Sequence, residues 1–98
     1  MAYFVMCIIG YLLGCSNLAF LLAKAKGVDL AGGGSGNPGA SNVTILMGWR
    51  LGVLVAIHDA GKALLAAILA KVLFPDTNGI AVVAGASCVL GHIFPVFL

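Results

Sequence analysis

The chain has 98 residues, of which 62% are hydrophobic and only 8% are charged. A soluble domain carries about 25% charged residues, and a chain this short would have to expose much of its surface to water. Eight per cent of charged residues cannot cover that surface. The composition therefore excludes an ordinary soluble domain, and we predict an all-α membrane protein. The net charge of +2 is too small and too dispersed to indicate a nucleic-acid partner.

The first predicted element is a transmembrane helix over residues 3–23, a stretch without one charged side chain. About 20 apolar residues are enough to cross the hydrocarbon core of a bilayer. A secretory signal peptide is the alternative, but its positive charges would come before the apolar stretch. Here Lys24 and Lys26 come after it, so we expect the helix to be retained.

A glycine-rich loop, residues 24–50, follows the first helix. Its centre reads Gly32-Gly33-Gly34-Ser35-Gly36-Asn37-Pro38-Gly39-Ala40-Ser41-Asn42. Successive glycines let backbone N–H groups converge on phosphate oxygens, and a helix beginning near Asn42 would add its positive N-terminal end. A flexible linker is the alternative, but asparagine and proline specify turns and caps. The composition of the loop therefore slightly favours phosphate binding.

Two further apolar stretches, residues 51–74 and 80–98, are separated by a short turn of helix-breaking residues. We expect both to be transmembrane helices, which gives about three spans in a single membrane-embedded domain. The three cysteines lie inside apolar runs without the spacing of metal ligands, so the sequence indicates no metal site.

The distribution of basic residues predicts the orientation of these helices. Lys24, Lys26 and Arg50 flank the long loop, so the positive-inside rule places this loop in the cytoplasm and the amino terminus outside. The third helix then returns toward the cytoplasm. His92, near its end, would share a membrane face with the glycine-rich loop.

Three polar residues in the apolar stretches are candidates for the site. Asp59 and Lys62 lie three residues apart and therefore on one face of a helix. An isolated charge at the bilayer centre costs roughly 2.5–3.5 kcal/mol, so mutual neutralisation and support of a polar site are both open explanations. A lone histidine on an apolar helix is usually structural. His92, however, follows a glycine and is expected at the same membrane face as the glycine-rich loop. No serine–histidine–acid spacing is evident.

Two stretches resemble signatures of one known family. Residues Gly34-Ser35-Gly36-Asn37-Pro38-Gly39-Ala40-Ser41-Asn42-Val43 resemble the first signature of the bacterial acyl-phosphate:glycerol-3-phosphate acyltransferases, the PlsY family. Residues Gly91-His92-Ile93-Phe94-Pro95-Val96-Phe97 resemble another stretch of that family. Tyr11-Leu12-Leu13-Gly14, Gly27-Val28-Asp29 and the Asp59/Lys62 pair occur in the family's order, so the resemblance covers the whole chain.

The resemblance implies a multi-pass enzyme of the bacterial inner membrane, without a cofactor or a metal. It would transfer a fatty acyl group from acyl phosphate to glycerol 3-phosphate, giving lysophosphatidate for phospholipid synthesis, with membrane lipid as its surroundings. Ser35 and His92 would be catalytic, and Asp59 and Lys62 would support the site. The residues that would bind substrate phosphate are Gly34, Gly36, Asn37, Gly39 and Asn42.

The sequence also departs from the family pattern. Ala31 and Ile45 stand where the family has arginine, and the arginine expected at the second position holds substrate phosphate. The family continues past the last residue here into a Gly/Lys-rich loop and more helices, so we expect a fragment or short member, completed by another half or by self-association. Two other functions stay open: a non-catalytic membrane subunit that binds a phosphorylated lipid, and half of a transporter.

Overall fold

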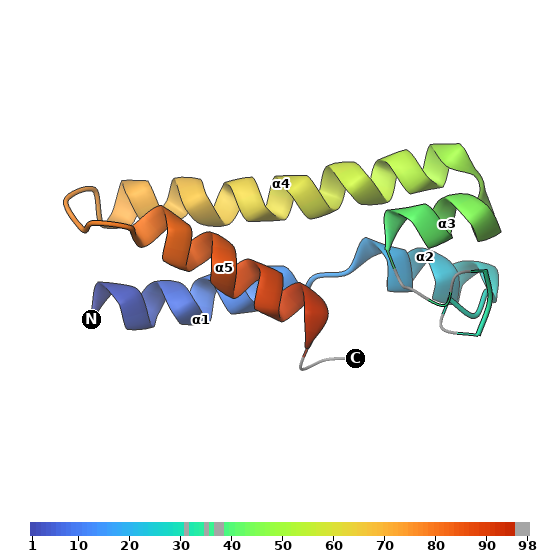
Figure 1. The fold of residues 1–98 in the computed structure, drawn as a ribbon, viewed down its shortest axis with the longest axis horizontal. Helices are drawn as coiled ribbons and strands as arrows, with labels where there is room; N and C mark the ends of the chain where they lie inside the picture. Colours follow the sequence, from blue (N-terminus) through green and yellow to red (C-terminus); the bar gives the residue numbers. More distant parts are fainter. Residues whose placement is uncertain (31, 35, 37–38, 96–98) are drawn as a thin grey trace. The chain divides into compact units, whose positions relative to one another are not determined.

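The computed structural model describes residues 1–30, 32–34, 36 and 39–95. Over these residues the regular secondary structure is entirely α-helical, as the composition predicts (Figure 1). The helices are α1 (Ala2–Cys15), α2 (Leu18–Lys26), α3 (Ala40–Met47), α4 (Trp49–Leu73) and α5 (Ile80–Ile93). The chain divides into two compact units, one made of Met1–Ser16 with Ala60–Leu98 and the other of Asn17–Asp59.

The apolar stretch expected as one helix over residues 3–23 is two helices, α1 and α2. Ser16 leaves the helical conformation with a ψ of 121°. Asn17 is the N-cap of α2, and its side-chain Oδ1 accepts a hydrogen bond of 3.2 Å from the backbone N–H of Phe20. Asparagine is among the best N-cap residues because its short side chain reaches the N–H groups of the first turn. Across this break, Ala2–Lys26 is still long and apolar enough to cross a membrane.

Other boundaries also differ from the expected ones. The expected loop over residues 24–50 contains a helix of its own, α3, and α4 already begins at Trp49. The third apolar stretch leaves helical geometry at Phe94, with φ −123° and ψ 64°. Phe94 precedes Pro95, and a residue before proline is driven out of the α region by steric clash. Residues 96–98 of that expected helix lie outside the described part of the chain.

In the first unit, α1 and α5 lie alongside each other (Figure 1). Gly10 and Gly14 of α1 face α5. A Cβ added to Gly10 would lie 2.5 Å from the carbonyl oxygen of Ala84, and one added to Gly14 would overlap the backbone of Cys88. Two glycines spaced four apart allow helix backbones to approach closely, which is how helices associate where lipid supplies no hydrophobic driving force.

Two tyrosines of α1 bind carbonyl groups just beyond the two ends of α5. The Tyr3 hydroxyl donates to the carbonyl oxygen of Asn78 at 2.7 Å. The Tyr11 hydroxyl donates to the carbonyl oxygen of Phe94, the C-cap residue of α5, at 2.5 Å. The last carbonyls of a helix lack partners within the helix, so Tyr11 satisfies a group that α5 itself cannot.

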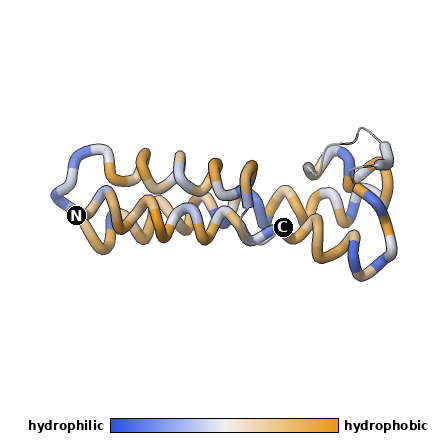
Figure 2. Tube along the Cα trace, turned by 90° about the horizontal axis from the view of Figure 1, so that it is seen from below, coloured by the Kyte–Doolittle hydropathy of each residue, from blue (hydrophilic) through white to orange (hydrophobic). Residues whose placement is uncertain are grey.

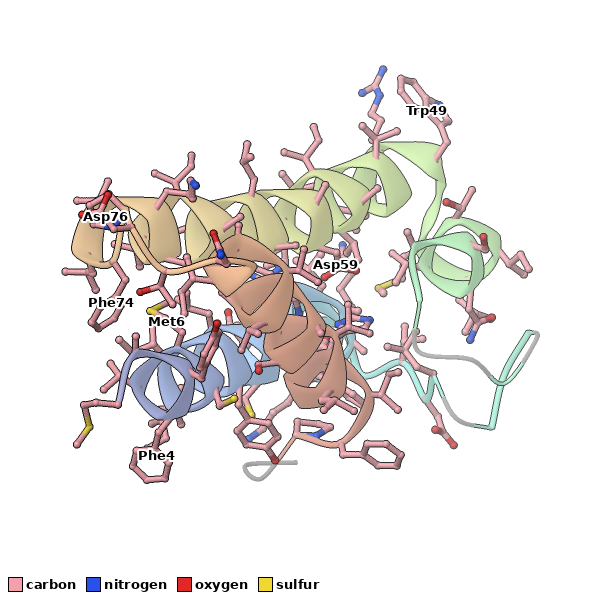
Figure 3. The ribbon with its side chains drawn as sticks, turned by 60° about the vertical axis from the view of Figure 1, so that its left-hand side comes forward. Phe4, Met6, Trp49, Asp59, Phe74 and Asp76 are labelled. Carbon is pink, nitrogen blue, oxygen red and sulfur yellow. The ribbon has the colours of Figure 1, made fainter. Side chains whose placement is uncertain are left out.

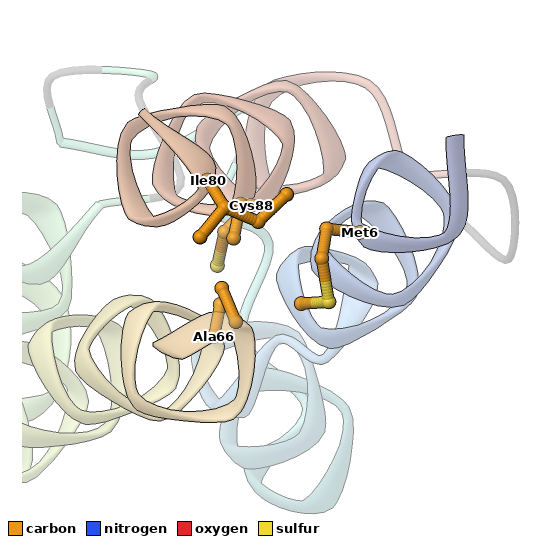
Figure 4. Packing of buried hydrophobic residues seen from close by; sticks show 6 residues of the cluster. Met6, Ala66, Ile80 and Cys88 are labelled. Carbon is orange, nitrogen blue, oxygen red and sulfur yellow. The ribbon is translucent and has the colours of Figure 1, made fainter. Parts of the chain in front are cut away.

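Each unit has its own apolar cluster. Figure 4 shows side chains of the first cluster between α1, α4 and α5, and Figure 3 shows Met6 turned inward and Phe4 turned outward from α1. The buried members of the first cluster are Met6, Ala66, Ala70, Ile80, Ala84 and Cys88. Those of the second cluster are Ala19, Ala23, Leu30, Val43 and Val55.

Much of the outer surface of the helices is also apolar. Figure 2 shows hydrophobic residues along most of the trace that starts at the amino terminus. Large side chains such as Phe4, Val72 and Val82 are 66%, 70% and 75% exposed. Within the described residues, Ala2–Lys26 and Trp49–Leu73 are long and apolar enough to span a membrane, and Ile80–Ile93 is a shorter apolar helix. Such an exterior is suited to lipid, where helices satisfy their own backbone groups.

Candidate functional site

The glycine-rich loop begins where α2 ends. Gly27 caps the helix in the left-handed conformation, with φ 67°, and the N–H of Val28 returns to the carbonyl oxygen of Ala23 at 2.9 Å. Glycine is the residue that takes this conformation without strain. Two residues later, Asp29 Oδ1 accepts a hydrogen bond of 3.0 Å from the N–H of Gly32. The carboxylate therefore folds the first part of the loop into a turn.

Asn42, in the first turn of α3, binds the backbone of the loop through its side chain. Its side chain is 0% exposed, and its Nδ2 donates to the carbonyl oxygen of Leu30 at 2.8 Å and to that of Gly33 at 3.2 Å. Both N–H groups of the amide are thus used on loop carbonyls, since a side-chain amide has two. This geometry gives Asn42 a part in fixing the shape of the loop.

Two loop glycines adopt backbone angles that other residues rarely adopt. Gly34 and Gly36 have φ values of 54° and 76°, and the N–H of Gly36 bonds the carbonyl oxygen of Gly33 at 2.9 Å. A Cβ on Gly34 would also overlap the side-chain oxygen of Asn42. The close approach of Asn42 to the loop backbone therefore requires glycine at this position.

The loop leads directly into the N-terminus of α3, whose N-cap residue Gly39 makes no side-chain capping bond. The first backbone N–H groups of a helix lack acceptors within it, and their partial positive charge favours anions. The helix expected near Asn42 thus begins at Ala40, with Ser41 exposed in its first turn. Ser35 and Asn37, two other expected site residues, lie outside the described part of the chain.

In the first unit, α4 places the ammonium group of Lys62 at the C-terminal end of α1. The side chain of Lys62 is only 7% exposed. Its Nζ donates to the carbonyl oxygen of Gly14 at 2.9 Å and to that of Ser16 at 2.7 Å. These carbonyls are available because α1 ends at Cys15, and the C-terminal end of a helix carries partial negative charge.

The same ammonium group lies 2.8 Å from Nδ1 of His92, in the last turn of α5. The backbone of α5 is fixed here by two contacts with α1. The Cα of Gly91 lies so close to the carbonyl of Tyr11 that a Cβ would overlap it, and the Tyr11 hydroxyl binds the carbonyl of Phe94. The first unit therefore brings together two of the candidate residues, Lys62 and His92, from helices distant in sequence.

Asp59, the other charged candidate of α4, belongs to the second unit. Its Oδ1 lies 3.4 Å from Nδ1 of His58, and both side chains are partly buried. The sequence pattern does not single out His58, because adjacent residues of a helix point in different directions. The structure places the histidine and the carboxylate beside each other all the same.

The second unit also shows what stands near the position where the family has arginine. Ile45 of α3 is 63% exposed. Arg50 stacks on its neighbour, with its guanidinium carbon 5.5 Å from the centroid of the Trp49 ring, a cation–π contact. Figure 3 shows Trp49 projecting outward at the start of α4. Among the described residues, no group of three or more histidine, cysteine, aspartate or glutamate side chains could hold a metal ion.

Comparison with known proteins gives a consistent result. The profile of the family named glycerol-3-phosphate acyltransferase matches residues 4–98. A glycerol-3-phosphate acyltransferase of Myxococcus xanthus is 46% identical over 92 residues, which are 93% of this chain and 48% of that protein. A protein of the same name from Aquifex aeolicus is 43% identical over 90 residues, covering 92% of this chain and 47% of that protein.

Solved structures agree with the sequence matches. The crystal structure of PlsY (YgiH), an integral membrane glycerol 3-phosphate acyltransferase, in its glycerol 3-phosphate form aligns with a TM-score of 0.89 and 40% identity, over 100% of this chain and 49% of that one. The lysophosphatidic acid form aligns with a TM-score of 0.84 and 39% identity, over 100% and 48%. The chain thus spans about half the length of these relatives. It is a helical membrane protein, and it belongs to the glycerol-3-phosphate acyltransferase family.

Proposed function

We propose that this chain takes part in the transfer of a fatty acyl group from acyl phosphate to glycerol 3-phosphate, which yields lysophosphatidate and inorganic phosphate. The observation that carries the proposal is the glycine-rich loop held by Asn42 in front of the N-terminus of α3. Both substrates carry phosphate, which such a backbone site binds. The ligands named for the two similar structures, glycerol 3-phosphate and lysophosphatidic acid, support the assignment.

In this proposal the residues of the loop have two kinds of role. Backbone N–H groups of the loop and the hydroxyl of Ser35 contact phosphate oxygens, while Asn42 acts on the phosphate through the loop carbonyls that it holds. His92 provides a ring N–H donor for the reaction. The loop residues proposed to contact phosphate are Gly34, Ser35, Gly36, Asn37 and Gly39.

The proposed chemistry asks for positioning more than for strong acid or base groups. In acyl phosphate the leaving group is already phosphate, so the acceptor hydroxyl can attack the acyl carbon once the two substrates are held together. The new ester C–O bond forms as the bond between the acyl carbon and the phosphate oxygen breaks. Orientation of the hydroxyl and fixed N–H donors near the developing charge would lower the barrier.

We further propose that the chain lies in a bacterial inner membrane with its amino terminus outside and the glycine-rich loop in the cytoplasm. Lys24 and Lys26 in the last turn of α2 support this orientation. In a Cys7→Ala background, Ala25→Cys should react with a membrane-impermeant maleimide only after the cytoplasmic side is opened. Asn78→Cys, in the turn before α5, should react from outside. The opposite pattern would reverse the topology.

An acyl-transfer assay on membranes containing this chain tests the activity, with palmitoyl phosphate and labelled glycerol 3-phosphate as substrates. We expect lysophosphatidate from the natural chain, a large loss in Ser35→Ala and little change in the control Ser41→Ala. Ile45→Arg should increase turnover at low glycerol 3-phosphate, because it restores a cation for phosphate. Absence of product from correctly inserted protein, with Ile45→Arg equally inactive, would refute catalysis by this chain.

The exposed Ile45 favours a second candidate function, a non-catalytic subunit that binds a phosphorylated lipid. Without a cation at that position, the glycine-rich centre of the loop, residues 32–42, supplies only neutral donors to phosphate. Binding of labelled lysophosphatidate by the inserted chain, lost in Ser35→Ala and without any acyl transfer, would support this function. Flux of a phosphorylated solute without a covalent product would instead indicate half of a transporter.

A further inference from the structure

The contact between Lys62 and His92 carries chemical information beyond the burial of two polar groups. Lys62 Nζ lies 2.8 Å from Nδ1 of His92, so one of these two nitrogen atoms donates a hydrogen to the other. A histidine ring with one hydrogen carries it either on Nδ1 or on Nε2, and only the remaining nitrogen can accept. The partner of Nδ1 therefore decides which nitrogen of the ring is a donor.

The other partners of Lys62 indicate the direction of this hydrogen bond. An ammonium group has three N–H donors and no acceptor. Two of its hydrogens are directed to the carbonyl oxygens of Gly14 and Ser16, at 2.9 and 2.7 Å. Both carbonyls lie at the negative end of α1, which stabilises a positive charge there. The same ammonium group lies 2.8 Å from Nδ1 of His92. Because an ammonium nitrogen cannot accept a hydrogen bond, Nδ1 is the acceptor.

We infer that Lys62 is a positioning residue that holds His92 in the tautomer with its hydrogen on Nε2. The inference rests on the proposed function in one respect: it makes the Nε2–H group the donor that His92 offers to a phosphate oxygen of the substrates. Lys62 is only 7% exposed, and its ammonium group acts on the substrates only through the His92 ring. The helix end, the lysine and the histidine thus form one chain of hydrogen bonds.

The opposite arrangement is chemically possible and gives a clear contrast. A neutral amine on Lys62 could donate to the two carbonyls and accept a hydrogen from Nδ1–H of His92. The ring would then carry a lone pair on Nε2, which repels a phosphate oxygen instead of binding it. The tautomer of His92 therefore distinguishes the two arrangements directly.

Nitrogen NMR of the full 98-residue chain with ¹⁵N-labelled histidine, inserted in lipid nanodiscs, reads the tautomer from the shifts of the two ring nitrogens. The variants are Lys62→Met, which removes all donors, and Lys62→Arg, which keeps a cation with donors only. Lys71→Met is the matched control, because Lys71 is an exposed lysine of the same helix. His58, which lies beside Asp59, serves as an internal reference.

We expect a hydrogen-free Nδ1 and a protonated Nε2 on His92 in the natural chain, in Lys62→Arg and in Lys71→Met, and a mixture of tautomers in Lys62→Met. A hydrogen on Nδ1 in the natural chain would overturn the inference, and so would an unchanged spectrum in a folded Lys62→Met. If Lys62→Met fails to insert, the natural chain and Lys62→Arg still decide. If the natural chain shows the expected tautomer but catalyses no acyl transfer, the proposed function is refuted and the inference about Lys62 stands.

Discussion

At the scale of single residues, the glycine-rich loop contains glycines with different reasons for being glycine. Gly27 and Gly34 both have positive φ, at 67° and 54°. A Cβ on Gly27 would meet nothing within 4 Å, whereas a Cβ on Gly34 would overlap the side-chain oxygen of Asn42. The first glycine is needed for its backbone angle only, and the second is needed for space as well.

Substitution by alanine should separate these two reasons. We expect Gly27→Ala to cost about 1 kcal/mol, the penalty of a left-handed alanine, and to leave phosphate binding intact. Gly34→Ala should cost more, because the added methyl group also displaces Asn42. It should weaken the proposed binding of glycerol 3-phosphate about tenfold, the change that corresponds to roughly 1.4 kcal/mol. Thermal unfolding and a radioligand binding assay on both variants measure this, and equal effects would contradict it.

Asn42 is the residue on which the shape of the loop depends. Asn42→Ala removes the amide donor from the buried carbonyl of Leu30, whereas the carbonyl of Gly33 keeps the N–H of Gly36. A buried group left without a partner costs about 1–3 kcal/mol. We expect a loss of stability in this range, together with weaker binding of glycerol 3-phosphate if the chain binds it as proposed. Asn78→Ala, at an exposed turn, is the control and should change neither quantity. Normal binding by Asn42→Ala would mean that the loop keeps its shape without the clamp.

At the scale of helices, the contact between α1 and α5 depends on small residues. Gly14 of α1 has the backbone of Cys88 where its Cβ would be, while Gly85 of α5 has open space at that position. We expect Gly14→Ala to destabilise the first unit by about 1–3 kcal/mol, the usual cost of overpacking. Gly85→Ala should be neutral or slightly stabilising, because alanine favours a helix more than glycine does.

Unfolding of both variants in mixed micelles, followed by circular dichroism, tests this difference. Cys88, which is buried, gives a second measurement, since separation of α1 from α5 would expose its thiol to a maleimide. Faster labelling of Cys88 in Gly14→Ala than in Gly85→Ala is the expected result. Equal labelling rates would show that the two helices accommodate the extra methyl group.

At the scale of the whole molecule, the two units have separate apolar clusters. Met6 and Val43 are each 0% exposed, the first in one cluster and the second in the other. Truncation of either to alanine should cost about 2–5 kcal/mol for methionine and less for valine. Hydrogen exchange in nanodiscs should rise mainly within Met1–Ser16 and Ala60–Leu98 for Met6→Ala, and within Asn17–Asp59 for Val43→Ala. A uniform rise in either variant would mean that the two units open as one.

Much of this organisation could be predicted from sequence, because length and hydropathy report on the solvent of a helix. Three apolar stretches, their approximate positions and the family follow from composition and motifs. The break at Asn17 had a readable signal, an N-cap residue inside an apolar run, but the apolar flanks suggested one continuous span. The first turn of α3 was likewise indicated only by the residues around Asn42.

The contacts of the candidate site could not be predicted, because they join residues far apart in the chain. Lys62 and Asp59 share a helix face by spacing, which suggested a local pair. The ammonium group also reaches His92, 30 residues away, and Gly14, 48 residues away. No periodicity encodes such a contact, since it depends on how α1, α4 and α5 pack. The parts assigned to Ser35 and Asn37 remain predictions.

The two tyrosine hydroxyls of α1 have a consequence for depth in the bilayer. They bind the carbonyl of Asn78 at one end of α5 and that of Phe94 at the other. Together these two bonds fix the position of α5 along α1. A slide of α5 by one turn, about 5.4 Å, would break both bonds together. His92 is therefore held at a fixed height along the helix axis relative to the C-terminal end of α1. A residue inserted into α5 or deleted from it would therefore shift His92 relative to the end of α1 or break one of the two tyrosine bonds.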